Sequence, residues 1–600
     1  MVLRIYILSF MIILGGSKAN LVFAAGSSAK ATILSQDARL AQFFEDIFQR
    51  NIANSPDRQT SLGLKTERQG LWTDISDDYS KARTEEVKQD LARLEAEFDY
   101  AKLSPDSQLS YDIFKFKLQQ AIENARFLRH LYVLDQFQGQ FTYSLTLLQN
   151  NHKIDSVQDA QDYISRIIGI EDRLAEMVKQ SQDRANYGVI APQFAFPAMI
   201  ADIQSIIEQV PIKADFADKV AALNISAAEK KGLIDNANKA IEGPFKRGYI
   251  ALLNEVKRLA KLQKATQGVW ALPEGEAFYQ NRIKNYTNLD MTADQIHEFG
   301  KADVARIHAE MRQIMQKVGF KGSLQAFFEF VRTDPNNFYP NSEAGQEAFL
   351  ADARAQTAAI FKVAPKFFNK LPKAELEVRK VEAWRENSTS IAFYNRPSMD
   401  GTRPGIYYAN LADMTGVQKY VFTAITYHEG VPGHHFQLAL AQELEGLSNF
   451  RKFGGGNAFV EGWALYAEKL AKEMGFYQDP MQDFGRLQDE IWRSVRLVTD
   501  TGIHAKKWTR QQAIDYFVKN TPLSPQDIET EVERYFVLPG QALGYKMGMT
   551  KILELRQRAE NALGDTFDIR AFHDVIIGQG AMPLPILEQQ VDRYIESNKI

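Results

Sequence analysis

Apolar residues recur with the 3.6-residue period of amphipathic helices along most of this chain. This period constrains the fold more than any other feature, because each such segment must bury one apolar stripe against a neighbour. The sequence therefore predicts a mainly helical protein, and no fixed-period repeat indicates a solenoid. The clearest helical segments are 40–52, 84–98, 106–128, 157–180, 217–263, 294–318, 346–358, 418–428, 434–444, 458–474, 481–507, 509–520, 527–536 and 539–562.

One region departs from the helical period. Segments 376–383, 389–394 and 405–410 alternate apolar and polar residues and are rich in Val, Ile and aromatic side chains. We therefore predict a small sheet of about three strands, directly upstream of a histidine-rich segment. No low-complexity linker forces a domain boundary, so residues 26–600 are predicted to form a single domain.

Residues 1–25 have the pattern of a secretory signal peptide. Arg4 supplies the positive charge, and the apolar stretch 5–14 is shorter than the ~20 residues that span a bilayer. Small residues around Ala24 offer a cleavage site, and no cysteine follows that could be lipidated. We expect a periplasmic or secreted protein with no membrane contact after cleavage. A retained transmembrane anchor is the alternative.

Composition limits the possible chemistry. The chain contains no cysteine, which excludes disulfides, thiolate ligands and cysteine nucleophiles and leaves histidines and carboxylates as metal ligands. The net charge of -4 gives no support for a nucleic-acid partner.

Segment 426–435, Thr-Tyr-His-Glu-Gly-Val-Pro-Gly-His-His, gathers three of the nine histidines around a glutamate. It is similar to the HExxH signature, in which two histidines one helical turn apart bind zinc and the glutamate polarises a water. The match is imperfect, because Pro432 stands where the second histidine belongs and His434 and His435 come later.

Helix geometry indicates what such a site requires. In an unbroken helix His435 would lie ~10 Å further along than His428, too far to share a metal. The intervening Gly-Val-Pro-Gly sequence disfavours a regular helix. We therefore expect an interruption that brings either His434 or His435 beside His428.

A third ligand is predicted in the apolar helix 459–468. Its two carboxylates, Glu461 and Glu468, lie two turns apart on nearly the same face. A carboxylate in an apolar helix is costly to bury unless it is paired or bound to a metal. Glu461 would complete a set of two histidines and one carboxylate, and Glu468 would orient a histidine. For each of these residues considered alone, a purely structural role or a solvent-exposed position is the alternative to metal binding.

These motifs together resemble a known family. His428-Glu-x-x-Pro-Gly-His-His followed by Glu461-Gly-Trp-Ala-x-Tyr-x-Glu is similar to a bacterial family long labelled as a domain of unknown function. Its fold resembles carboxypeptidase Taq and, more distantly, the oligopeptidases and angiotensin-converting enzyme, all gluzincin peptidases. The resemblance covers most of the chain and is sharpest over 403–548.

The resemblance implies a large, two-lobed helical fold with a central cleft and one Zn²⁺. It also implies a site in which His428, Glu461 and one of His434 and His435 bind the metal, with Glu429 as general base. A Gly-His ending is common in related peptidases and favours His434, with His435 as the alternate ligand.

Hydrolysis of a peptide also needs a donor for the oxyanion. Tyr545 and His504 are candidates, and Asp500 lies one turn before His504, so the two could pair. Core packing is the alternative for Tyr545. Arg493 and Arg496 could grip a substrate carboxylate or could lie in solvent.

Two further candidates for substrate binding precede the histidine-rich segment. Arg403 opens the Arg-Pro-Gly-Ile-Tyr-Tyr sequence that belongs to the resemblance, and Tyr408 ends it. The strand that carries Tyr408 could pair with an extended peptide. It could equally pack a cleft wall.

We therefore predict an exported zinc metallopeptidase, of carboxypeptidase or oligopeptidase type, that hydrolyses short peptides. Glu429 would deprotonate a zinc-bound water. One alternative is a metal- or peptide-binding protein of the same fold without activity. Another is a zinc amidase or esterase with non-peptide substrates. Specificity, the native metal and the oligomeric state have no readable signal.

Overall fold

The computed structural model describes residues 35–137, 140–381, 386, 391–398, 401 and 403–599. The predicted signal peptide, residues 1–25, lies outside the described residues, as do parts of the predicted strand segments 376–383 and 389–394.

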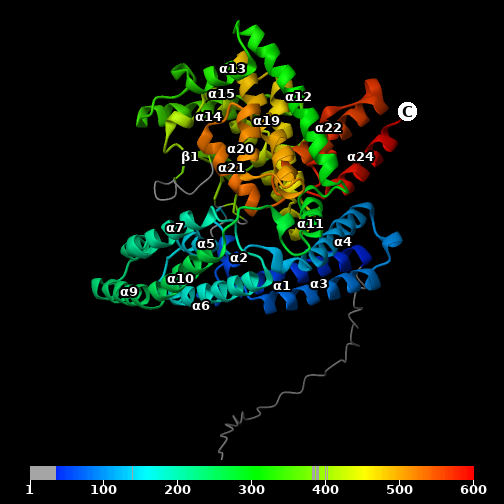
Figure 1. Ribbon diagram of the computed structural model, residues 1–600. Coiled ribbons are helices and arrows are strands. Elements are labelled where there is room, and N and C mark those ends of the chain that lie inside the picture. Colours follow the sequence, from blue (N-terminus) through cyan, green and yellow to red (C-terminus); the bar gives the residue numbers. More distant parts are fainter. Residues whose placement is uncertain are drawn as a thin grey trace, which may run out of the picture.

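The first half of the chain forms a layer of helices at the bottom of Figure 1. Serine side chains cap several of these helices: Ser35, Ser76, Ser104 and Ser156 each accept a backbone N–H of the first turn. Helix α6 packs against α9 and α10, and together they bury the core of this layer. The helices are α1 (Gln36–Ala53), α2 (Pro56–Ser61), α3 (Asp77–Glu97), α4 (Pro105–Ala125), α5 (Gln140–Asn150), α6 (Val157–Tyr187), α7 (Ala195–Gln209), α8 (Ile212–Ala221), α9 (Ala227–Ala240) and α10 (Lys246–Leu262).

The second half forms the upper lobe of Figure 1 and carries the histidine-rich segment. Its elements are α11 (Gly275–Thr287), α12 (Ala293–Lys317), α13 (Leu324–Thr333), α14 (Glu343–Val363), β1 (Leu376–Lys380), β2 (Ala392–Asn395), β3 (Gly405–Ala409), α15 (Lys419–Glu429), α16 (His434–Glu443), α17 (Asn449–Lys452), α18 (Asn457–Glu473), α19 (Pro480–His504), α20 (Arg510–Asn520), α21 (Pro525–Val537), α22 (Leu543–Leu563), α23 (Ile569–Ile576) and α24 (Leu584–Asn598). The prediction of a mainly helical fold with a small sheet is confirmed.

Predicted helix 217–263 is wrong as a single element. The chain forms α8, α9 and α10 there, and a π-helical turn, Ile241–Phe245, separates the last two. Gly243 leaves the helical region with φ −96° and ψ −105°, and Pro244 has no N–H to donate.

No helix among the described residues is long and apolar enough to cross a membrane.

The sheet has the strand order β1-β3-β2, with β1 parallel and β2 antiparallel to β3. The three predicted strands are therefore confirmed. Because side chains alternate along a strand, Tyr407 points into the core that contains α15, while Ile406 and Tyr408 pack on the other face. Contacts with α15 and α16 place the sheet beside the histidine-rich segment.

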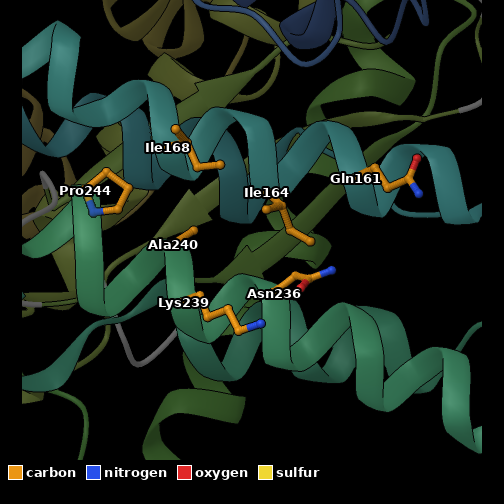
Figure 2. A pocket seen from close by; sticks show the side chains of 7 residues that line it. All are labelled: Gln161, Ile164, Ile168, Asn236, Lys239, Ala240 and Pro244. Atoms are coloured by element: carbon orange, nitrogen blue, oxygen red, sulfur yellow. The ribbon is translucent and has the colours of Figure 1, made fainter.

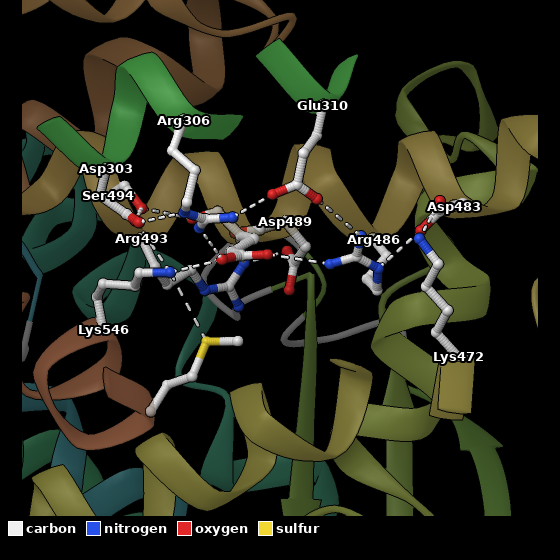
Figure 3. Close-up of polar contacts among 12 residues, drawn as sticks. Asp303, Arg306, Glu310, Lys472, Asp483, Arg486, Asp489, Arg493, Ser494 and Lys546 are labelled. Atoms are coloured by element: carbon white, nitrogen blue, oxygen red, sulfur yellow. Dashed lines mark hydrogen bonds and ion pairs between the residues drawn. The ribbon is translucent and has the colours of Figure 1, made fainter. Parts of the chain in front are cut away.

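Helix α19 is the central element of the upper lobe and packs against α12, α15, α20, α21 and α22. Several of its charged side chains are buried, and their partners come from α19 itself and from neighbouring helices. Lys546 of α22 lies 2.6 Å from Glu490 and 3.0 Å from Asp303, and Figure 3 shows Lys546 and Asp303 within this polar network. Arg486 is likewise held by Glu490, at 3.0 Å. Pairing of this kind removes most of the cost of burying these charges.

Candidate metal centre

A sharp turn separates α15 from α16. Helix α15 ends at Glu429, the backbone leaves the helical region at Gly430 (φ −96°, ψ −116°), and α16 begins at His434. A Cβ on Gly433 would lie 1.9 Å from the carbonyl oxygen of His428, so a larger residue would not fit. Trp463 of α18 donates its Nε1–H to the carbonyl of Pro432 at 2.9 Å. The interruption predicted from the sequence is confirmed.

The turn brings three candidate ligands together. Nε2 of His434 lies 3.4 Å and Nε2 of His428 lies 3.8 Å from Oε2 of Glu461. The two imidazoles meet edge to face, with ring centroids 4.8 Å apart. Both nitrogens and the carboxylate oxygen lie within 4.8 Å of one another, a group that could hold a metal ion.

His435 points away from this group. Its Nδ1 lies 3.0 Å from the hydroxyl of Tyr394 on β2. The imidazole is 2% exposed, and burial lowers its pKa to about 4. The sequence left open whether His434 or His435 joins His428. The structure places His434, and not His435, with His428 and Glu461.

The donor set fits zinc. Two imidazole nitrogens and one carboxylate are the usual protein ligands of a hydrolytic zinc site. Burial disfavours the ionised form of Glu461, but hydrogen bonds and charges of His428 and His434 outweigh it and hold its pKa below the ordinary value. Nδ1 of His434 is buried and has no hydrogen-bond partner among the residues described.

Glu429 lies at the end of α15 beside these residues. Burial raises the pKa of its carboxyl, and the neighbouring His434 and His428 oppose the shift. Its Oε2 is buried, and no group in the described part of the chain forms a hydrogen bond with it. A carboxylate with a raised pKa and a free oxygen is suited to accept a proton.

A second carboxylate orients the first ligand. Nδ1–H of His428 donates to Oε1 of Glu468 at 2.7 Å, which leaves Nε2 as the lone-pair donor. Glu468 lies against Asp489 of α19. Burial and the charge of Asp489 raise the pKa of Glu468 well above its ordinary value, while Arg493 bonds Asp489 and holds its carboxylate ionised.

Comparisons with known proteins place the chain in a family. Residues 56–591 match the family described as "Bacterial protein of unknown function (DUF885)". The chain belongs to this family. No curated protein matches it.

Two solved structures share the DUF885 chain's fold. A protein described as "the putative lipoprotein from Colwellia psychrerythraea" is 29% identical, with a TM-score of 0.87, and the match covers 94% of this chain and 100% of that one. A "putative lipoprotein of unknown function from Shewanella oneidensis" is 20% identical, with a TM-score of 0.71, and the match covers 92% and 99%. At 20% identity, the similarity to the second structure is evidence of a shared fold only.

The structure does not support the predicted catalytic role of His504 in this DUF885 chain. Its Nδ1 accepts the backbone N–H of Val269 at 3.0 Å, and its Nε2 donates to the carbonyl of Tyr535 at 2.9 Å. No imidazole donor is left for an oxyanion. The predicted pair with Asp500 is not formed either, because Asp500 accepts hydrogen bonds from Tyr279, at 2.5 Å, and from the backbone of Gly540.

Arg493 and Arg496 are buried and paired, so the alternative that they lie in solvent is wrong. Arg493 pairs with Asp489, and Arg496 pairs with Glu531 at 2.8 Å. Tyr545 lies beside them, with the Arg496 guanidinium 4.6 Å from its ring centroid. The Tyr545 hydroxyl accepts only long hydrogen bonds of 3.4 Å. It is therefore weakly held and remains a candidate donor.

The two candidates near the sheet are not brought to the ligands. Tyr408 stacks on Phe393 at 4.9 Å, on the face of the sheet opposite Tyr407. Arg403 is exposed in the turn before β3, where its backbone N–H donates to Ser398. Tyr407, on the other face of the sheet, is buried in the core, and burial raises its pKa with a smaller contribution from the charge of Glu429.

A surface groove of about 440 Å³ lies elsewhere, between α6 and α9 of the lower layer. Figure 2 shows Ile164, Ile168 and Lys239 among its lining residues. The lining offers no histidine or carboxylate, so the groove has no ligands for a metal.

Three residues that support the centre were missed in the sequence. Trp463 anchors the turn, Tyr394 contacts His435, and Asp489 lies close to Glu468. Trp463 stands inside the motif that begins at Glu461, which was the signal for it, whereas Tyr394 carries no local signal. The signal for Asp489 was present, because it is one of several charged residues spaced three or four apart on the apolar helix α19.

Proposed function

We propose that this chain is a zinc-dependent peptidase that hydrolyses short peptides. The observation that carries the proposal is the approach of His428 Nε2, His434 Nε2 and Glu461 Oε2, with Glu429 beside them. A purely structural metal site has no use for a buried glutamate with a free oxygen next to its ligands.

A bound Zn²⁺ would supply Lewis acidity, which lowers the pKa of water and polarises a carbonyl. Side chains of the protein supply the other catalytic roles. Oε2 of Glu429 takes the proton from the attacking water and returns it to the leaving amine. Glu468 holds His428 in the tautomer that presents Nε2. Tyr545 donates a hydrogen bond from its hydroxyl to the developing oxyanion.

The substrate class and the location of the protein belong to the same proposal. The motif resemblance to carboxypeptidase Taq and the oligopeptidases favours short peptides. The signal-peptide pattern of residues 1–25 and the lipoprotein titles of two similar structures favour export.

The test is a digestion of a peptide library by purified protein, with elemental analysis of the same sample. We expect about one zinc per chain. We also expect peptide cleavage that a chelator abolishes and that added zinc restores. Glu429→Gln should keep the metal and lose about 10²- to 10⁴-fold in turnover.

Other outcomes identify the rival functions. Zinc bound without cleavage of any peptide or amide would indicate a binding protein. Chelator-sensitive cleavage of non-peptide amides or esters alone would indicate a different zinc hydrolase. Absence of metal from protein refolded with zinc would contradict the proposal as a whole.

A further inference from the structure

The two histidines of the candidate metal centre differ in what holds their second ring nitrogen. Nδ1 of His428 lies 2.7 Å from Oε1 of Glu468, so a carboxyl group fixes this imidazole. Nδ1 of His434 is buried, and no group in the described part of the chain forms a hydrogen bond with it. A histidine that binds a metal almost always donates its other N–H to an acceptor, and this bond orients the ring. The centre therefore requires an acceptor for His434.

Gln437 is a candidate acceptor on the same helix as His434. It lies three residues further along α16, so the two side chains leave the helix about 60° apart. Side chains at this spacing are neighbours on the helix surface, with Cβ atoms about 5–6 Å apart. Because side chains of a helix tilt toward its N-terminus, that of Gln437 covers the turn that begins at His434. The carboxamide can therefore reach the imidazole.

The carboxamide of Gln437 has no partner of its own. The residue is 0% exposed, and among the residues that the structure describes neither Oε1 nor Nε2 finds a hydrogen-bond partner. A buried amide without hydrogen bonds is costly, and an apolar side chain would fill the same space without this cost. The other glutamine of α16, Gln442, donates its Nε2–H to the carbonyl of Pro397 at 3.3 Å. An unpaired amide at position 437 therefore indicates a role other than packing.

A second unpaired acceptor lies near His434. Oε2 of Glu429 is buried and makes no hydrogen bond within the described part of the chain, and the charge of His434 acts on this carboxyl. Glu429 ends α15, on the other side of the turn from α16, and the proposed function assigns its free oxygen to the attacking water. Glu429 is therefore the rival that an experiment must separate from Gln437.

We propose that Gln437 is the positioning residue of His434: in the metal-bound protein its Oε1 accepts the Nδ1–H of His434 and leaves Nε2 to face the metal. Gln437 acts on His434 as Glu468 acts on His428, with a neutral amide in place of a carboxyl group. The inference rests on the metal centre of the proposed function and deepens it, but it does not require peptidase activity.

Gln437→Met separates this role from packing, because the two roles predict different results. Methionine has a similar shape and no hydrogen-bonding group, so the stability of the metal-free protein should be unchanged or increased. Zinc affinity should nevertheless fall by about 10- to 100-fold, because the imidazole of His434 is no longer oriented. Chemical denaturation of the metal-free protein measures the first quantity, and competition with a chromogenic chelator measures the second.

Two further variants complete the comparison. Gln437→Glu keeps an acceptor in the same place, so zinc affinity should be equal to or above that of wild type. Gln442→Met, on the same helix and about two turns beyond His434, is the matched control and should leave zinc affinity as in wild type.

The outcomes separate this inference from the proposed function. Wild-type zinc affinity in Gln437→Met would overturn the inference, as would an equal loss in Gln442→Met or in Gln437→Glu. A loss in Glu429→Gln without a loss in Gln437→Met would identify Glu429 as the acceptor. No measurement needs a substrate, so a protein that binds zinc and cleaves no peptide would refute the peptidase alone. A wild-type protein that binds no zinc would overturn both.

Discussion

Oε1 of Glu468 lies 2.7 Å from Nδ1 of His428, and this contact fixes which nitrogen of the imidazole faces Glu461. Both side chains are buried, so water does not compete for the hydrogen bond. The contact joins α15 to α18 across 40 residues of sequence. It makes the orientation of the first ligand a property of the folded core.

The first prediction follows from this contact. Glu468→Gln replaces the carboxyl group that accepts the Nδ1–H of His428 with an amide that can also present its NH₂ to the imidazole, so the orientation of His428 is less well fixed and zinc affinity should fall by about 10- to 100-fold. Competition with a chromogenic chelator measures the affinity. Glu445→Gln, an exposed glutamate in the turn after α16, is the control. Unchanged affinity in Glu468→Gln would mean that the contact has no role in metal binding.

The second prediction separates the two adjacent histidines. His434→Ala removes one of the three ligands and should lower zinc content well below one per chain at limiting zinc. His435→Ala removes a side chain that binds Tyr394 and should keep the metal, with a loss of stability from the vacated space. Elemental analysis after dialysis distinguishes them. Metal loss in His435→Ala alone would reverse the assignment.

A third prediction distinguishes the two sequence-derived oxyanion donors. Tyr545→Phe should lower kcat by about 10²- to 10³-fold with the metal and the melting temperature retained. His504→Ala leaves the N–H of Val269 and the carbonyl of Tyr535 unpaired in the core, so it should destabilise the fold by about 2–5 kcal/mol. Activity per folded molecule should persist in His504→Ala. A stable but inactive His504→Ala protein would restore the catalytic role.

The fourth prediction concerns acid. Burial lowers the pKa of His152 and His504 from 6.5 to about 4, and that of His573 to about 3. The unfolded chain binds these protons first as pH falls below 6.5, so stability is present above pH 6.5 and is lost toward pH 4. Each such histidine contributes about 3 kcal/mol to this loss.

Chemical denaturation of metal-free protein between pH 8 and 4 measures the effect, because removal of the metal eliminates its own pH dependence. His573→Gln should reduce the slope of stability against pH in this range. A slope that is the same with and without His573 would show that the residue titrates normally in the folded protein.

Much of the fold was predictable because it depends on local sequence. The helical period identified most helices of the upper lobe, and the alternating segments identified the three strands. The break between α15 and α16 was predictable because proline and glycine act through their own backbone. The failure at 217–263 has the same origin, since Gly243 and Pro244 gave a local signal that the helical period obscured.

The burial and pairing of charged side chains were harder to predict from the sequence. Arg493 and Arg496 resemble solvated residues in the sequence, yet both are paired inside the protein. Asp489 lies one turn before Arg493 on α19, so that pair has a local signal in the sequence, whereas Arg496 pairs with Glu531 of α21. No pattern within one helix contains the second pairing.

The sequence by itself determined the chemistry available to this protein: histidines and carboxylates without cysteine, a turn that breaks a helix, and a glutamate next to a histidine at the end of that helix. Only the tertiary structure decided which side chains meet. His434 and His435 are neighbours in the chain but diverge by about 100° around α16, and Tyr394 of the sheet binds the second while Glu461 of α18 faces the first. Contacts between distant segments, and not local preference, selected between them.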